Sequence, residues 1–205
     1  MIDKYRRTIN KESEKSSFWP TFTDMICSIL MVVILMLFSS ESIHVSVEQD
    51  LASQLTQSVK ENLEGMDVII DESTGQITFN ESTMFDIDSY ELKSEAKKML
   101  NEFIPKYINT IYSKYSENVD KIVIKGHTDD SGNYLYNLDL SQQRALSVAK
   151  YIVSSEIGEY KYKEDVLLDI EAIGRSEAEL IKNEDGSINQ DASRRVEIKY
   201  ELDIE

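Results

Sequence analysis

The chain has 205 residues, of which 38 are acidic and 22 basic, and its formal net charge is −16 at pH 7. This acidic surplus excludes an unaided nucleic-acid binder, which needs lysine and arginine to neutralise phosphates. One cysteine and two histidines supply neither a disulfide framework nor a multi-cysteine metal site. The composition therefore predicts no multi-cysteine metal site and no nucleic-acid partner, and neither a bound metal nor a cofactor is expected.

The longest apolar stretch lies near the N-terminus. Residues 25–38 carry no charge, and the stretch is 21 residues long when it is extended back to Phe18. A helix of that length spans roughly 30 Å, which is one hydrocarbon thickness of a bilayer. Trp19 suits the aromatic belt at a membrane interface, and Pro20 suits a first helical turn. The pattern predicts a transmembrane helix over residues 18–38.

A cleaved signal peptide is the alternative interpretation of this stretch. A positively charged flank followed by an apolar run would suit one. However, no clear small-residue cleavage site follows the run, and an acidic residue inside it, Asp24, is unusual for a secretion signal. A retained membrane anchor is the favoured interpretation.

The charges on the two sides of the apolar stretch predict its orientation. The next basic residue after Phe38 is Lys60, whereas the N-terminal side holds Lys4, Arg6, Arg7, Lys11 and Lys15. The positive-inside rule then places residues 1–17 in the cytoplasm. The chain is predicted to cross the inner membrane once and to place its strongly acidic C-terminal part in the periplasm.

Asp24 is an acidic residue inside the predicted membrane helix. A carboxylate there costs about 3 kcal/mol on insertion scales, so a functional role is the default interpretation. Thr21, Asp24 and Ser28 share one helix face, which should turn toward partner helices or a wet cavity. Alternatively, Asp24 lies at the cytoplasmic interface and is simply solvated. The functional alternative is a carboxylate that binds and releases a cation during transport.

The N-terminal sequence resembles the B subunits of motor stators. The resemblance rests on the short basic segment, on the sequence WPTFTDM at residues 19–25, and on the apolar run that follows. This family includes the flagellar MotB type and the ZorB subunit of the Zorya anti-phage system. The resemblance implies that Asp24 carries the transported proton or sodium ion. It also implies a homodimer of this chain inside a multi-helix A subunit of the MotA or ZorA type, in a five-to-two ratio.

Residues 39–65 are predicted to form a helical linker. Apolar residues recur there every four positions, namely Val47, Leu51, Leu55, Val59 and Leu63. This thin stripe can be covered either by a second copy or by the chain's own domain. Flagellar stators usually have a longer linker that holds a channel plug, so the short linker favours the Zorya-like interpretation.

Residues 66–205 alternate strand and helix patterns. A hairpin is predicted over residues 66–81, and strands are predicted over 121–125, 166–173 and 196–202. Apolar positions between 92 and 107 trace one helix face, and Pro105 should bend or restart that helix. A second helix face runs over 140–153. The sum is an α+β sandwich with helices on one face of a small sheet.

The segment after the strand at 121–125 carries the chemistry. Asp129 lies on a polar loop, and Arg144 follows Ser141, a plausible N-cap. A cation in a first helical turn opposes the helix dipole at a cost of about 0.3–1 kcal/mol, which suggests an anionic ligand. Asp129 and Arg144 together suit a zwitterion, with the carboxylate on Arg144 and the ammonium or amide on Asp129. A purely structural ion pair between them is the alternative.

This part of the chain also resembles the OmpA-like peptidoglycan-binding domain. The motifs are GHTD at 126–129, Asn137, LS at 140–141, RA at 144–145, GRSE at 174–177 and RRVEI at 194–198. The resemblance implies that Asp129 and Arg144 hold the diaminopimelate of the peptidoglycan stem peptide. It implies that the same pocket or its rim is lined by Thr128, Asn137, Leu140 and Arg195. Ser193 departs from the family, which prefers asparagine there.

Two classes of function follow from these features. The first is a peptidoglycan-anchored B subunit of an ion-driven motor, with protons as the favoured ion, in either the Zorya or the flagellar setting. The second is a passive peptidoglycan tether in which Asp24 is incidental. An enzyme is not expected, because no Ser–His–Asp set, catalytic cysteine pair or Walker loop is visible. No catalytic residue is therefore predicted.

Overall fold

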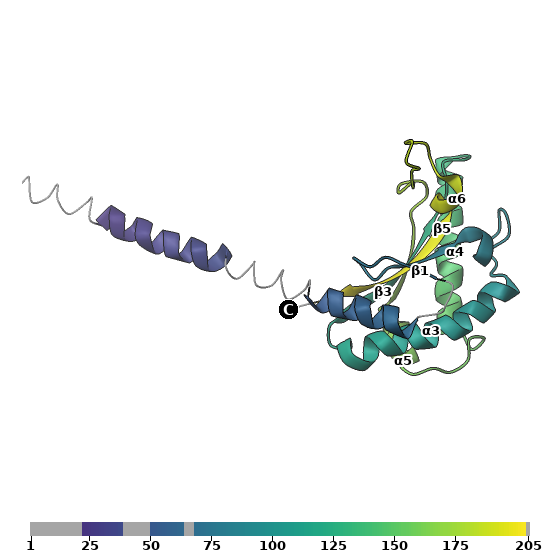
Figure 1. Ribbon diagram of the computed structural model, residues 1–205, viewed down its shortest axis with the longest axis horizontal. Helices are drawn as coiled ribbons and strands as arrows, with labels where there is room; N and C mark the ends of the chain where they lie inside the picture. The colour runs from purple at the N-terminus through teal and green to yellow at the C-terminus, as the bar shows by residue number, and fades with distance from the viewer. Residues whose placement is uncertain (1–21, 39–49, 64–67, 204–205) are drawn as a thin grey trace, which may run out of the picture. The chain divides into compact units, whose positions relative to one another are not determined.

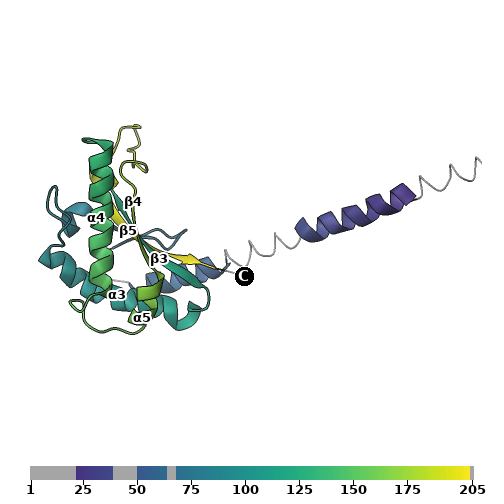
Figure 2. The same cartoon turned by 180° about the vertical axis from the view of Figure 1, so that it is seen from behind.

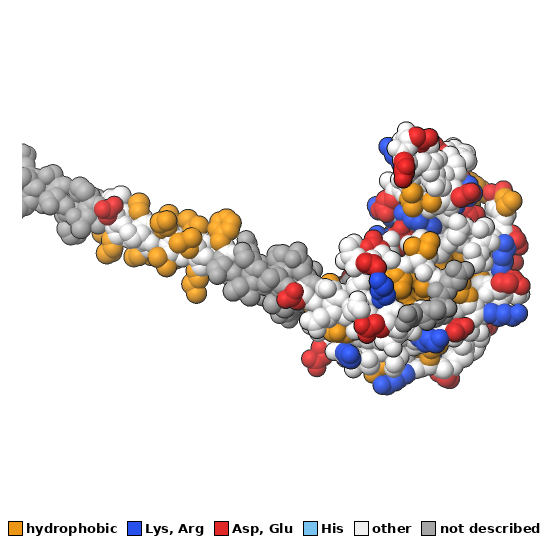
Figure 3. Space-filling model, in the orientation of Figure 1, with side chains coloured by type: hydrophobic (Ala, Val, Ile, Leu, Met, Phe, Trp, Pro, Cys, Tyr) orange, Lys and Arg blue, Asp and Glu red, His pale blue; other side chains and the backbone are white. Residues whose placement is uncertain are grey.

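The computed structural model describes residues 22–38, 50–63 and 68–203. The chain divides into two compact units, Met1–Val47 and Glu48–Glu205. In the first unit the described residues form one helix over 22–38, whose apolar side chains are exposed (Figures 1 and 3). Among the described residues, no helix has both the length and the apolar character needed to cross a membrane. Residues 18–21 of the predicted span and the predicted cytoplasmic segment 1–17 lie outside the described residues.

The second unit is built on a five-stranded mixed sheet. Its strands are β1 (Ile69–Ile70), β2 (Ile77–Asn80), β3 (Val119–His127), β4 (Ile170–Gly174) and β5 (Arg195–Leu202). They lie in the order β1-β2-β5-β3-β4, with β3 and β4 parallel and the other neighbours antiparallel. The predicted hairpin and the predicted strands at 121–125 and 196–202 are confirmed.

Helices cover one face of this sheet. They are α3 (Ser94–Tyr115), α4 (Tyr134–Val153), α5 (Lys163–Asp169) and a helix over residues 50–62. The short helices α2 (Glu81–Met84) and α6 (Gln190–Ser193) follow β2 and precede β5. Figure 2 shows α4 in front of the strands against which it packs. Successive strand side chains point to opposite faces, so β3 and β5 send alternate apolar residues into the core, namely Ile122, Ile124, Val196, Ile198 and Tyr200. The predicted α+β architecture is confirmed.

The structure corrects two expectations for the elements after residue 90. Of the bend or restart expected at Pro105, the restart is wrong, because α3 is continuous from Ser94 to Tyr115. The cost of about 3 kcal/mol for an interior proline is offset by the long buried face of α3. Residues 163–169 are helix α5, and the strand predicted over 166–173 is confined to β4. Glu164 and Asp165 favour a helix start there, since acidic side chains stabilise the first turn.

The helix over residues 50–62 packs against the chain's own domain. Leu55, Val59 and Leu63 are buried in the domain core. The hydroxyl groups of Thr56 and Tyr200 lie 2.9 Å apart in the interior, and the Tyr200 hydroxyl also donates to the carbonyl oxygen of Ala52 at 3.3 Å. Of the two alternatives for the apolar stripe, the structure therefore shows intrachain packing at these three positions. Residues 39–49 of the predicted linker lie outside the described part of the chain.

Replacing Thr56 with valine is expected to lower the free energy of unfolding by about 1 kcal/mol, because one buried hydrogen bond is lost at constant shape. Urea unfolding of the full chain, followed by the near-ultraviolet circular dichroism of the core tyrosines, measures this change. Ser58→Ala is the matched control, since it removes an exposed hydroxyl from the same helix. Equal effects of the two substitutions would contradict the packing described above.

Candidate functional site

A pocket of about 640 Å³ opens where the end of β3, the start of α4 and the segment around α2 meet. Five of the six side chains predicted to bind peptidoglycan line it, namely Thr128, Asp129, Asn137, Leu140 and Arg144. The structure thus brings these five together, and their binding role stays a prediction.

Arg195, the sixth predicted residue, does not line this pocket. It lies against a second pocket of about 780 Å³ beside β2 and β5. Its neighbour Arg194 lines the first pocket instead. Successive residues at the start of a strand point in opposite directions, so only one of the two arginines can face the site. The expected pocket residue Arg195 is therefore replaced by Arg194, which the motifs alone did not single out.

The helix that carries Arg144 begins earlier than predicted. α4 starts at Tyr134, and the side chain of Asn133 caps it by accepting a hydrogen bond from the Leu135 amide at 2.8 Å. Asparagine is among the best N-cap residues. Ser141 is therefore not an N-cap, and Arg144 lies in the middle of the helix. The prediction that Arg144 opposes the helix dipole is wrong, so the helix dipole gives no reason to expect an anionic ligand at Arg144.

The Arg144 guanidinium is fixed from several sides. Its Nη2 donates to Glu81 Oε1 at 2.6 Å, its Nε donates to the Ser89 carbonyl at 2.9 Å, and the group lies 5.4 Å from the centre of the Phe85 ring. Arg144 is 2% exposed. Within the described part of the chain, no hydrogen bond from its Nη1 is found. This nitrogen is the part of the guanidinium left for a ligand.

Asp129 is held as a carboxylate by hydrogen bonds. The Ser131 amide donates to its Oδ1 at 2.9 Å, and Arg194 Nη1 donates to its Oδ2 at 2.5 Å. Burial raises the pKa of Asp129, but the bonds from Arg194 and Ser131 outweigh burial, and the net pKa lies below the ordinary value. Among the described residues, Asp129 and Arg144 form no ion pair with each other, so the predicted alternative of a structural Asp129–Arg144 pair is wrong.

Two neighbouring residues link these charges into one network. Arg194 Nε lies 3.5 Å from Glu81 Oε2, while the other oxygen of Glu81 accepts from Arg144. Positive and negative groups therefore alternate from Arg144 through Glu81 and Arg194 to Asp129. Both signs of charge are offered to the pocket, and such a surface can bind a zwitterion.

The other predicted residues support this network in different ways. Asn137 Nδ2 donates to the carbonyl oxygens of Asp129 at 3.3 Å and Ser131 at 3.0 Å, which fixes the loop that carries Asp129. Leu140 supplies an apolar wall. Thr128 is buried, and its hydroxyl has no hydrogen-bond partner among the residues that the structure describes. Asn137 therefore positions the site, and Thr128 forms part of its lining.

Comparison with known families identifies this domain. Residues 84–194, more than half of the chain, match the family model described as the OmpA family. The chain belongs to the OmpA family. The OmpA match contains the network residues Asp129, Arg144 and Arg194, and it leaves Glu81 just outside its N-terminal limit.

Some curated relatives align with this chain beyond the OmpA domain. The chain is 25% identical to ZorB of Escherichia coli strain Crooks over 224 aligned positions, which cover 97% of this chain and 94% of ZorB. It is 28% identical to ZorB of Escherichia coli O139:H28, covering 65% of this chain and 59% of that protein. A solved MotB-like protein from Desulfovibrio vulgaris has a TM-score of 0.50 at 18% identity and covers 80% of this chain and 96% of its own. The predicted resemblance to MotB- and ZorB-type proteins is confirmed.

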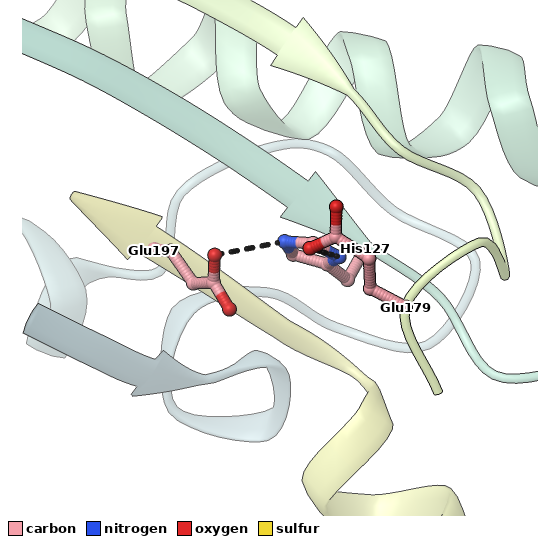
Figure 4. A group of neighbouring side chains, drawn as sticks. All are labelled: His127, Glu179 and Glu197. Carbon is pink, nitrogen blue, oxygen red and sulfur yellow. Dashed lines mark ion pairs between the residues drawn. The ribbon is translucent and has the colours of Figure 1, made fainter. Parts of the chain in front are cut away.

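A buried histidine, His127, is the last residue of β3 and directly precedes Thr128, which lines the first pocket (Figure 4). His127 is 1% exposed, with Nε2 at 3.1 Å from Glu197 Oε2 and Nδ1 at 4.0 Å from Glu179 Oε2. Arg195 Nε donates to the other oxygen of Glu197 at 2.7 Å. Histidine and carboxylates are metal-ligand types. However, the two carboxylates face different ring nitrogens and one is already neutralised by Arg195, which suits an ion-pair cluster. The absence of a metal remains a prediction.

Replacing Glu197 with glutamine is expected to destabilise the OmpA domain in a pH-dependent way. Burial raises the pKa of Glu197, but His127 and Arg195 lower it further, to about 2 against an ordinary 4.5. A carboxyl whose pKa is lowered on folding stabilises the fold above the ordinary pKa, and that contribution disappears as the pH falls from 4.5 to 2. The shift corresponds to roughly 3 kcal/mol.

Urea unfolding of wild type and Glu197→Gln at several pH values tests this expectation. The two free energies should differ most at pH 7 and should converge in acid. Glu201→Gln is the control on the same strand, because Glu201 pairs with Lys199 at 2.5 Å but is half exposed, so its loss should cost less than about 1 kcal/mol. A difference that does not change with pH would contradict the assignment.

Proposed function

We propose that the chain is the peptidoglycan-anchored B subunit of a proton-driven membrane motor of the Zorya type. The observation that carries the proposal is the pocket in which Asp129 and Arg144 stand at the two ends of one charge network. Similarity to ZorB over nearly the whole chain supports the assignment beyond the OmpA domain.

Anchoring uses the free end of a diaminopimelate side chain. That end carries an amino group and a carboxyl group on one carbon. Arg144 binds the carboxyl group through its remaining donors, and Asp129 binds the amino group. Ser131 and Asn137 hold the Asp129 loop, while Phe85 and Ser89 hold Arg144. Because these groups are fixed before the ligand arrives, little ordering is required on binding.

The membrane part uses the segment at residues 18–38. It crosses the inner membrane with the N-terminus in the cytoplasm and the OmpA domain in the periplasm. The described part of this segment is a helix that exposes large apolar side chains along its length, which supports the assignment. Asp24 lies near its start, and the Ser28 hydroxyl donates to the Asp24 carbonyl at 2.7 Å. Asp24 carries the proton.

The motor needs more than one chain, because one helix cannot enclose an ion pathway. Two copies of the chain supply Asp24 to a multi-helix A subunit of the MotA or ZorA type, in a five-to-two arrangement. The peptidoglycan contact gives the complex a fixed reference against which torque acts. A flagellar MotB-type role is the second candidate, and the full-length similarity to ZorB favours the Zorya role over it.

Cosedimentation of the full chain with purified sacculi tests the anchoring function. The chain in detergent is expected to pellet with sacculi and to be released by a soluble stem peptide that ends in diaminopimelate. A stem peptide with lysine at that position lacks the side-chain carboxyl group and should release much less. Failure to pellet, or equal release by the two peptides, would overturn the proposal.

A further inference from the structure

The first pocket carries exposed apolar side chains that its charge network does not use. Ile87 and Tyr136 both line this pocket, and their exposed fractions are 91% and 51%. Large apolar groups exposed together at a concave site mark a contact surface. The proposed contacts with diaminopimelate use Asp129 and Arg144 and give Ile87 and Tyr136 no role. The volume of about 640 Å³ also suits a ligand larger than the end of one amino-acid side chain.

The loop that presents Ile87 is held in place by its own contacts. The Ser89 carbonyl oxygen accepts from Arg144 Nε at 2.9 Å, and the Ser89 amide donates to the Asp86 carbonyl at 3.1 Å. Between them, Asp88 has a φ of 54°, in the left-handed region that aspartate adopts more readily than most residues. Ile87 is therefore presented in a fixed position before any ligand binds, which lowers the entropic cost of binding.

A sugar ring matches the side chains of this part of the pocket. The flat face of Tyr136 offers apolar surface to the C–H face of a sugar, and Ile87 extends that surface. The Tyr136 hydroxyl donates to Asp88 Oδ1 at 3.3 Å, and a carboxylate can accept several hydrogen bonds, so exposed Asp88 can also accept from sugar hydroxyls. Methyl and carboxylate side chains of a stem peptide offer neither a broad apolar face nor hydroxyl donors.

The spacing along α4 allows a sugar and diaminopimelate to bind together. Tyr136, Leu140 and Arg144 line the pocket from one face of α4, because they lie four residues apart. From Tyr136 to Arg144 the helix rises about 12 Å. The stem-peptide residues between diaminopimelate and the sugar, at roughly 3.5 Å each, span a comparable length together with the lactyl link. The sugar can therefore reach Tyr136 while diaminopimelate lies at Arg144.

We propose that Tyr136 and Ile87 form a carbohydrate subsite of this pocket. The subsite holds an N-acetyl sugar of the glycan strand to which the bound stem peptide is attached. The inference rests on the proposed peptidoglycan anchoring and extends it from the stem peptide to the glycan. Tyr136 contacts the sugar directly, and Asp88 accepts from its hydroxyl groups.

Calorimetric titration of the full chain in detergent with two ligands tests the subsite. One ligand is a disaccharide-tripeptide that ends in diaminopimelate, and the other is the same tripeptide with an acetyl group in place of the sugars. Wild type is expected to bind the disaccharide form about tenfold more tightly. Tyr136→Ala should lose this tenfold advantage and keep the wild-type affinity for the sugar-free peptide. Tyr136→Phe keeps the ring and should retain most of the advantage.

Tyr134→Ala is the matched control. It removes another tyrosine from the first turn of α4, where Tyr134 is 50% exposed and does not line the pocket. The ratio of the two affinities should stay as in wild type. Near-ultraviolet circular dichroism verifies that each variant is folded, and the wild-type ratio decides the question by itself if Tyr136→Ala does not fold.

The outcomes separate the inference from the proposed function. If neither ligand binds folded wild type, the anchoring function is overturned. If wild type binds both ligands equally, the carbohydrate subsite is overturned while anchoring stands. An equal loss for both ligands in folded Tyr136→Ala, or loss of the advantage in Tyr134→Ala, would also overturn the role of Tyr136.

Discussion

Replacing Arg144 with alanine is expected to abolish cosedimentation of the chain with sacculi. The substitution removes the donors that face the pocket and leaves Glu81 buried without its 2.6 Å partner. Removing one member of a buried ion pair costs about 3–5 kcal/mol. Loss of binding could therefore come from loss of the ligand group or from loss of the fold, and a second variant must distinguish them.

Arg144→Lys provides that distinction. Lysine keeps the positive charge beside Glu81 but lacks the planar fork that reaches Glu81, Ser89 and the pocket together. It should retain the tyrosine circular dichroism of wild type and bind sacculi at least tenfold more weakly. Arg175→Ala is a control for a general loss of positive charge, because Arg175 forms a half-exposed pair with Glu179. Wild-type binding by Arg144→Lys would show that a point charge suffices, and binding by a folded Arg144→Ala would exclude this pocket.

The parts of the fold that could be predicted are those with short-range patterns. The hairpin and the strand β5 follow from alternation of apolar and polar residues over a few positions, and the strand within β3 follows from a short continuous apolar run. The pocket residues Asp129 and Arg144 could be predicted because their motifs belong to a family, and the match over residues 84–194 bears out that resemblance.

The start of α4 could not be predicted from the same patterns. Ser141 and Asn133 are both good capping residues, and the apolar face begins near Ser141. Asn133 is the cap in the structure, because residues 134–140 are already helical and the Asn133 side chain bonds to their first turn. Capping preference alone does not rank two candidates that lie two turns apart.

The ion-pair partners of Asp129 and Arg144 could not be predicted, because they lie far away along the chain. Glu81 bonds to Arg144 across 63 residues, and Asp129 bonds to Arg194 across 65. Pattern reasoning paired Asp129 with Arg144 because they were the recognisable charges in one segment. The sheet instead brings α2 and the start of β5 beside the pocket, so each predicted residue gains a partner from elsewhere. Only the order of the strands could have revealed these pairs.

Replacing Asp24 with asparagine is expected to abolish motor activity and to leave sacculus binding unchanged. Asparagine has nearly the shape of aspartic acid but cannot take up and release a proton, so the carrier step that we propose for Asp24 should fail. Asp24 belongs to the unit Met1–Val47, whereas the pocket belongs to the unit Glu48–Glu205, which is compact by itself. Cells that produce the chain with its A subunit should therefore lose phage protection, while the purified variant still pellets with sacculi.

Two further variants make the Asp24 experiment decisive. Asp24→Glu keeps a titratable carboxyl group and should retain part of the protection. Ser28→Ala removes the hydroxyl that bonds to the Asp24 carbonyl but leaves the carboxyl group in place, so it should have a small effect. Full protection by Asp24→Asn would favour the passive tether, because a tether needs only the membrane helix and the pocket. Loss of both protection and sacculus binding would show instead that the substitution damages the whole chain, and the proton-carrier role would lose its support.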